Sequence, residues 1–159
     1  MAKILTINNI DYYSYADLED ANIYNNAIYG SVWNSLEPIV QSQLLVEATR
    51  TIDGYTYIGE KADPEQPLKF PRISRRGVIS DDSVLTALCC QVALYIYKNG
   101  SSSSGSSSGD LLNSLSKWQI GDVHVEFKDD VKIDLSGLDD IIADALAEWM
   151  KSNSMEIWL

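Results

Sequence analysis

The stretch from 48 to 72, ATRTIDGYTYIGEKADPEQPLKFPR, joins the end of one predicted helix to a long loop. Three prolines interrupt the segment 59–77, and a proline inside a helix removes a backbone donor and clashes with the preceding turn. The segment is too long for a simple connection. We therefore expect it either to pack on the protein body through Leu68 and Phe70 or to contact a partner.

A helix is predicted on each side of this stretch. The first begins near Ser31 or Ser35, with Trp33 packing at its entry, and its apolar residues recur at every fourth position: Leu36, Val40, Leu44, Ala48 and Ile52. The second, 84–97, is apolar nearly all round, which is typical of a helix at the centre of a bundle. Between them, residues 55–58 alternate weakly and fit either a short strand or a turn.

Capping residues and β-prone segments predict where the remaining helices and strands lie. Ser14 precedes a helical pattern from Tyr15 to about Ala27, and Ser80 with two following acids starts the apolar helix. Residues 3–8 are β-prone, and residues 118–127 read as a strand pair or one extended strand.

The C-terminal part of the chain begins with a low-complexity segment and ends with an apolar one. Residues 99–109, NGSSSSGSSSG, predict a native surface loop in preference to an engineered linker. Ser136 opens an amphipathic helix whose apolar face runs through 138–150, and an apolar tail follows at 155–159.

These patterns predict a mainly α fold. We expect a small helical bundle with a short β strand pair or hairpin, a long proline-containing loop, and an extended C-terminal helix and tail. The core would span 1–128, and 129–159 would form either part of the same domain or an arm that embraces a neighbour.

Charge is unevenly distributed along the chain. The formal net charge is −11, from 12 basic and 23 acidic residues, which argues against a general nucleic-acid binder. Residues 61–76 are the exception, with 5 basic and 2 acidic side chains. Two interpretations are open: the charged surface is simply solvated, or an acidic face repels DNA that passes nearby and the basic loop binds a partner.

No pattern of catalytic residues occurs. The only histidine, His124, has no second histidine or suitable cysteine to form a zinc site with it, and Cys89 and Cys90 are predicted to be small buried side chains in a reducing compartment. An acidic loop at 129–134 matches no calcium-binding spacing. We expect no enzymatic activity, no metal and no cofactor, and a protein that is neither exported nor inserted in a membrane.

One cluster has the composition of a single-stranded nucleic-acid platform. Arg72, Arg75 and Arg76 follow Phe70, and two tyrosines lie just before this loop. The competing interpretations are an ordinary loop surface and a protein-docking site. The overall acidity of the chain favours both of these over nucleic-acid binding.

Several pieces of the chain, taken in order, resemble one family of tailed-phage proteins. These are the head–tail connector proteins, also called adaptor or head completion proteins, whose members often carry the label "putative DnaT-like single-stranded-DNA-binding". The resemblance covers about 12–127. Its first half rests on a helix after an aromatic-Ser segment, a tryptophan, the motif Ala-Thr-Arg-x-Ile-Asp and an aromatic-x-aromatic turn. Its second half rests on Asp-Pro-x-Gln-x-Leu-x-Phe-Pro-Arg, a Gly-x-Ile step, an apolar helix and a strand similar to Gly-x-x-x-Val-x-Phe. In this sequence those pieces are 13–27, Trp33, 48–53, 55–59, 63–72, 77–79, 84–100 and 120–127. Two departures are a serine near Ser80 in place of the usual proline, and a final helix and tail that extend past the common core.

The resemblance implies a structural virion protein. Its copies would form a ring, expected to be a dodecamer, between portal and tail, completing the head and helping to retain packaged DNA. The implied partners are the portal protein, a tail-side connector, stopper or tail protein, other copies of the chain, and double-stranded DNA that passes without specific binding. The expected location is the neck of the virion, after synthesis in the host cytoplasm.

The residues expected to contact partners lie in the basic loop and at the C-terminal end. They are Arg72, Arg75, Arg76, Trp149, Met150, Ile157, Trp158 and Leu159. The alternative function is that of a single-stranded-DNA-binding accessory protein of replication.

Overall fold

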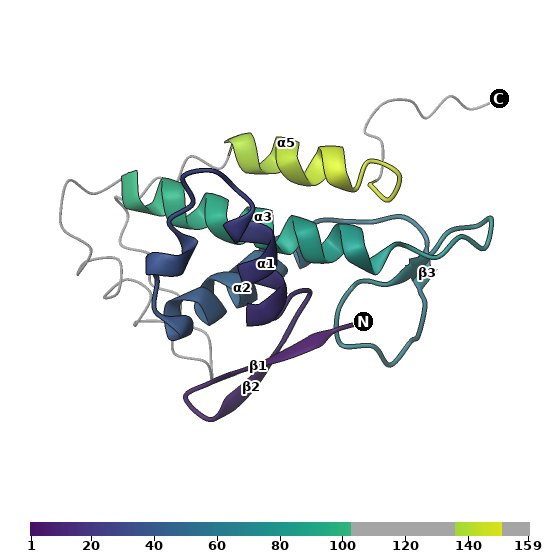
Figure 1. Ribbon diagram of the computed structural model, residues 1–159. Coiled ribbons are helices and arrows are strands. Elements are labelled where there is room, and N and C mark those ends of the chain that lie inside the picture. The colour runs from purple at the N-terminus through teal and green to yellow at the C-terminus, as the bar shows by residue number, and fades with distance from the viewer. Residues whose placement is uncertain (103–135, 151–159) are drawn as a thin grey trace, which may run out of the picture.

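The computed structural model describes residues 1–102 and 136–150 (Figure 1). Its elements are β1 (Lys3–Ile7), β2 (Ile10–Ser14), α1 (Leu18–Asn26), the 3-10 turn η1 (Trp33–Ser35), α2 (Pro38–Asp53), β3 (Glu60–Lys61), β4 (Arg72–Ile73), α3 (Asp82–Ser102) and α5 (Ser136–Ala145). The described residues thus combine four α-helices with two small antiparallel strand pairs. The expectation of a mainly α bundle is therefore confirmed only in part, as a small domain of helices with two short strand pairs.

The N-terminal hairpin pairs β1 with β2 from Lys3 opposite Ser14 to Ile7 opposite Ile10. Asn8 and Asn9 form its turn with φ angles of 51° and 63°. Asparagine tolerates this left-handed conformation better than most residues, so the pair suits a two-residue hairpin turn. The expected β-prone segment is confirmed, and its pairing partner is the segment just after it.

Two helices begin later than the sequence signals indicated. Asp17, and not Ser14, caps α1: its carboxylate accepts a 2.9 Å hydrogen bond from the Asp20 amide, and the Asp20 carboxylate accepts one from the Asp17 amide at 3.2 Å. Ser14 is buried at the end of β2, where its hydroxyl lies 3.1 Å from the Thr49 hydroxyl. A reciprocal carboxylate–amide pair satisfies two backbone donors, which a lone serine cannot do.

The second helix, α2, begins at Pro38 and not at Ser31 or Ser35. Pro38 occupies the first turn, where its missing N–H leaves no bond unmade. Trp33 lies before the helix, fully buried, and its indole N–H donates to the Asn22 side chain at 3.0 Å. The tryptophan therefore packs at the entry to α2, as expected.

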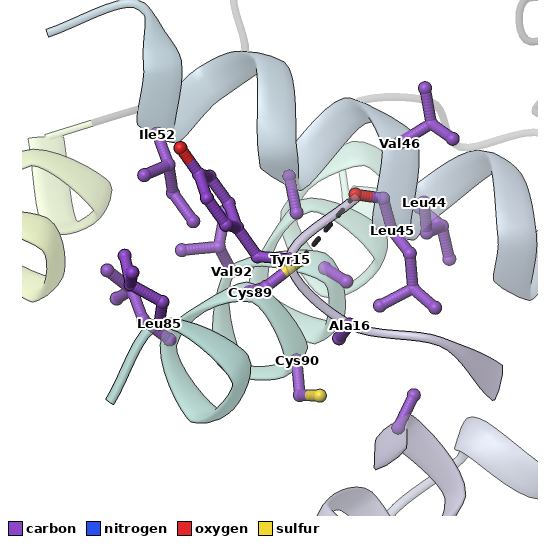
Figure 2. Close-up of a cluster of buried hydrophobic side chains, with 14 of the residues drawn as sticks. Tyr15, Ala16, Leu44, Leu45, Val46, Ile52, Leu85, Cys89, Cys90 and Val92 are labelled. Atoms are coloured by element: carbon purple, nitrogen blue, oxygen red, sulfur yellow. Dashed lines mark hydrogen bonds between the residues drawn. The ribbon is translucent and has the colours of Figure 1, made fainter. Parts of the chain in front are cut away.

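The core lies where α3 packs against α2 and α1 (Figures 1 and 2). Cys89 and Cys90 are fully buried and unbridged, as predicted. The Cys89 thiol lies 3.6 Å from the Leu45 carbonyl oxygen, the contact dashed in Figure 2, and burial raises the pKa of that thiol. The predicted central helix is confirmed.

The ends of α3 differ from the prediction. Asp81, and not Ser80, takes the capping position, since its carboxylate accepts a 2.8 Å hydrogen bond from the Ser83 amide. The helix continues to Ser102, so the first part of the expected Gly/Ser loop is helical, and the rest of that loop lies outside the described residues.

The last helix, α5, packs along α3 (Figure 1). The predicted apolar face is confirmed because Leu138, Ile142, Leu146 and Trp149 are all buried. The helix itself ends at Ala145, and turns carry the chain to Met150. The predicted strand at 118–127, the tail at 155–159 and the proposed division at residue 128 lie outside the described residues.

One core position carries an unexplained cost. Asn25 on α1 is fully buried, and its side-chain amide has no hydrogen-bond partner in the described part of the chain. A buried polar group without a partner costs about 1–3 kcal/mol, and nothing in the described structure explains this one.

Candidate nucleic-acid interface

The long loop 59–77 is anchored to the body by Phe70. Its side chain is 1% exposed and meets three aromatic rings edge to face. The ring centroids lie 6.3 Å from Tyr15, 4.7 Å from Tyr57 and 6.2 Å from Trp149. Leu68 is buried as well, so the prediction that these two residues pack on the body is confirmed.

A half-buried carboxylate fastens the same loop to the end of α2. Asp53 accepts hydrogen bonds from the Tyr15 hydroxyl and, at 3.2 Å, from the Lys69 amide. The Tyr15 oxygen in turn accepts the Phe70 amide at 3.2 Å. Burial raises the pKa of Asp53, and burial with the neighbouring Asp53 charge raises the pKa of Tyr15.

Gln66 organises the middle of the loop. Its side-chain amide donates to the carbonyl oxygens of Leu68 at 2.9 Å and Pro71 at 3.0 Å, and its oxygen accepts the Asp63 amide at 3.1 Å. One side chain therefore links three points of a segment that has almost no regular structure. This part of the loop is a folded unit.

Arg72 is bound to the protein itself. Its guanidinium donates to four backbone carbonyl oxygens: Ile58 at 2.9 Å, Gly59 at 2.5 Å, Lys69 at 3.3 Å and Tyr57 at 3.5 Å. Its backbone amide donates to the Ser80 hydroxyl at 2.9 Å. A guanidinium with this many carbonyl acceptors has little donor capacity left for a ligand.

The two lysines of the basic loop also have partners. The Lys61 ammonium donates to the Gln66 carbonyl oxygen at 3.1 Å. The Lys69 ammonium donates to the Tyr55 carbonyl oxygen at 2.6 Å and lies 5.9 Å from the centre of the Tyr57 ring. Both charges therefore help to hold the loop together.

Beyond Arg72 the chain forms a small hairpin, residues 73–80, which we call the basic hairpin. In Figure 1 its turn projects from the body beside β3, near the start of α3. Ile73 bridges Ile79, the Ser74 amide donates to the Val78 carbonyl at 2.9 Å, and the Gly77 amide donates to the Ser74 carbonyl at 2.9 Å. Gly77 has a φ of 77°, which glycine adopts without strain. The turn therefore has a defined conformation.

Arg75 and Arg76 lie at this turn and are exposed. Neither guanidinium has a hydrogen bond or ion pair with any of the described residues, whereas the backbone around them is held by the Ser74 hydroxyl, which accepts the amides of Arg76 at 3.3 Å and Val78 at 3.2 Å. Two free guanidinium groups on an ordered turn are well suited to bind phosphate oxygens.

The aromatic residues do not form the expected stacking surface. Phe70 and Tyr57 are buried, and the Tyr57 hydroxyl donates to the Ile52 carbonyl oxygen at 2.6 Å. The Tyr55 hydroxyl donates to the Asp139 carboxylate of α5. The apolar side chains that lie open beside the arginines are instead Val78 and Ile79, at 56% and 60% exposure. Sequence reasoning missed these two, although their position next to the arginine pair was a usable signal.

Of the predicted C-terminal contact residues, the structure describes two and leaves three outside its range. Trp149 is 8% exposed against Phe70, and its carbonyl oxygen accepts the Ile58 amide at 2.7 Å. Met150 is half-buried and bridges Tyr57. These two residues contact the anchored loop of their own chain, while Ile157, Trp158 and Leu159 lie outside the described residues. A partner contact at this end of the chain stays a prediction.

Two further features are missing from residues 1–102 and 136–150. No group of three or more His, Cys, Asp or Glu side chains there could hold a metal ion. No helix there is both long and apolar enough to cross a membrane. His124 and the acidic loop at 129–134 lie outside this range.

Comparison with protein families gives one match. The family described as "Putative DnaT-like ssDNA binding protein" matches residues 6–159, almost the whole chain. Comparisons with curated proteins and with solved structures found no match.

This match corrects the expected function. The family description names single-stranded DNA binding, which was the alternative, and nothing in it indicates a connector between portal and tail. The connector function is therefore wrong. No comparison tests the partners and virion location that were expected with it.

Proposed function

The chain belongs to the DnaT-like family, and from this membership and the free arginines of the basic hairpin we propose that it binds single-stranded DNA. The supporting observation is that Arg75 and Arg76 are exposed on an ordered turn and unpaired within the described residues, while the neighbouring Arg72 is bound to backbone carbonyls. The proposal assigns binding and no catalysis.

Phosphate contact is the chemistry that this arrangement favours. A guanidinium presents a planar set of donors that can bind two phosphate oxygens at once. Two such groups on neighbouring residues can contact one phosphate or two successive phosphates of a strand. The hairpin backbone is fixed by its own hydrogen bonds, so little ordering of the loop is needed on binding.

The charge around the hairpin limits the strength of this contact. Asp81 and Asp82 follow directly and are exposed, and the protein as a whole carries a net charge of −11. Two contacted phosphates on a single strand predict a slope of about −1.4 in a plot of log affinity against log salt concentration. We expect weak, strongly salt-sensitive binding by each copy of the chain.

The test measures fluorescence anisotropy of a labelled oligo-dT as a function of salt. The variant Arg75→Ala/Arg76→Ala should weaken binding at low salt and reduce the magnitude of the salt slope by about 1.4. A matched control, Arg50→Ala/Lys98→Ala, removes the same charge from α2 and α3 and should keep the slope. The proposal is wrong if the unaltered protein binds no oligonucleotide at low salt, or if the hairpin variant binds as the unaltered protein does.

A further inference from the structure

Val78 and Ile79 lie beside the arginines in an unusual setting. Both are large aliphatic side chains, and 56% and 60% of their surfaces are open to solvent on the same short hairpin that carries Arg75 and Arg76. Apolar residues exposed singly are ordinary, but here two adjacent ones and two free guanidinium groups make the exposed surface of one short hairpin both cationic and apolar.

From this surface we propose that Val78 and Ile79 make the basic hairpin selective for unpaired bases over duplex DNA. The inference rests on the proposed function and specifies which residues determine its selectivity. Arg75 and Arg76 bind the phosphates, and the two aliphatic side chains lie against the faces of bases that no complementary strand covers.

Selectivity for single strands needs apolar side chains because phosphate contacts alone cannot supply that selectivity. Duplex DNA has a higher charge density than a single strand, so two arginines alone would favour the duplex. The faces of unpaired bases are apolar and accessible only in the single strand. Apolar side chains gain binding free energy by covering those faces, and they gain almost nothing on a duplex, whose base faces are stacked on one another.

The hairpin geometry keeps the two functions close together. Ile73 bridges Ile79 across the hairpin, and the Val78 carbonyl accepts the Ser74 amide, so both aliphatic residues are fixed relative to the turn. Arg76 and Val78 are separated only by Gly77, so the cationic and apolar residues belong to one tight turn of the chain.

The occupant of this surface is a nucleic-acid strand and not an apolar protein partner, because charge decides between them. Of the described basic residues in the loop, Arg75 and Arg76 are the two whose side chains have no partner within the described residues, and only Gly77 separates them from the apolar pair. A polyanion with exposed apolar faces satisfies both halves of the surface at once.

The experiment compares three labelled probes of equal length: oligo-dT, its duplex with oligo-dA, and an abasic strand that keeps the phosphates. The variant Val78→Thr/Ile79→Thr keeps the β-branched shape that suits this hairpin and replaces one methyl group of Val78 and the ethyl group of Ile79 with hydroxyls. It should bind oligo-dT about tenfold more weakly, bind the duplex as before, and keep the salt slope. The control Ile4→Thr/Ile23→Thr alters residues that are 58% and 69% exposed elsewhere and should change none of these quantities.

The abasic strand tests the inference with the unaltered protein as well. That protein should bind oligo-dT about tenfold more tightly than the abasic strand, and the threonine variant should bind the two alike. Equal binding of oligo-dT and abasic strand by the unaltered protein overturns the inference, as does a threonine variant that loses duplex and single-strand affinity in parallel. If oligo-dT binding depends on Arg75 and Arg76 but not on the bases, only the selectivity is wrong; if no probe binds, the proposed function is wrong and the inference with it.

Discussion

Two adjacent segments, the start of the long loop and the basic hairpin after it, both carry basic and large apolar residues but differ in what those side chains contact. In the anchored part, residues 59–72, the aromatic and arginine side chains contact the protein itself. Phe70 is buried, and the Arg72 guanidinium donates to backbone carbonyls. In the turn that follows, Arg75 and Arg76 are exposed and free within the described residues. Aromatic and basic composition alone therefore does not locate a binding surface.

The difference has a physical cause. The anchored part has little regular structure, so its backbone carbonyl oxygens need donors from elsewhere, and Arg72, Lys69 and Gln66 supply them. The short hairpin satisfies its backbone internally through the Ser74–Val78 and Ser74–Gly77 pairs. Apart from the Ser74 hydroxyl, no side chain is needed to hold the turn, and the two arginines are left for contacts outside the described residues.

The largest effect is expected for Phe70→Ala. Removing a fully buried aromatic ring that contacts three others should lower the free energy of unfolding by about 3–5 kcal/mol, measured by urea denaturation. The control Ile79→Ala, at a residue 60% exposed, should change it by less than about 0.5 kcal/mol. A loss below about 1 kcal/mol at Phe70 would mean that the loop is not anchored as described.

The second effect concerns the half-buried carboxylate of Asp53, which holds the anchored part to the end of α2. Tyr15→Phe removes the donor to Asp53 and the acceptor of the Phe70 amide, so we expect a loss of about 2–3 kcal/mol at neutral pH. Burial already raises the folded-state pKa of Asp53 above its unfolded value of about 3.9, so ionised Asp53 lowers stability as pH rises through that folded-state value. Loss of the tyrosine hydroxyl raises this pKa further.

The cost of Tyr15→Phe should therefore be largest above the folded-state pKa of Asp53 and should shrink as pH falls toward about 4, where the carboxyl is protonated. Urea denaturation of both proteins between about pH 4 and 7 measures this dependence. A cost that does not change with pH would show that the hydroxyl acts through packing and not through the carboxylate.

The sequence was informative where one periodicity dominates a long segment. Apolar residues at every fourth position predicted the buried face of α2, the near-continuous apolar run predicted α3 as the central helix, and the i, i+3, i+4 spacing predicted the buried side of α5. Leu68 and Phe70 were also predicted correctly, because large apolar residues in a polar proline-rich loop need a place to be buried.

Sequence reasoning failed where several polar groups compete for one role. Ser14 looked like a helix cap, but Asp17 and Asp20 satisfy two backbone donors together and displace it. The N-terminal hairpin was missed because its turn, Asn8–Asn9, was not recognised as a left-handed pair. The bonding of Arg72 to four carbonyls depends on the tertiary placement of residues 57–59, which no local pattern encodes.

A smaller effect on stability is expected for Arg72→Ala. The guanidinium is half-exposed and water can replace part of its bonding, so we expect a loss of about 1–2 kcal/mol. Arg72→Lys should recover little of it, since a single ammonium cannot reach four carbonyl oxygens in this fixed geometry. The salt slope of DNA binding should stay unchanged in both variants. A slope reduced by about 0.7 would show that Arg72 contacts a phosphate, and would remove the distinction between the two parts of the loop.

The smallest effect on stability is expected at the turn itself. Arg75→Ala/Arg76→Ala should change the free energy of unfolding by less than about 0.5 kcal/mol, because neither side chain has a partner among the described residues and the turn is held by backbone bonds and the Ser74 hydroxyl. Denaturation of this variant beside Ser74→Ala separates the two contributions, since only the serine change removes acceptors from the amides of Arg76 and Val78. If the arginine variant lost as much stability as the serine variant, the arginines would be structural, and their freedom to bind phosphate would no longer follow from the fold.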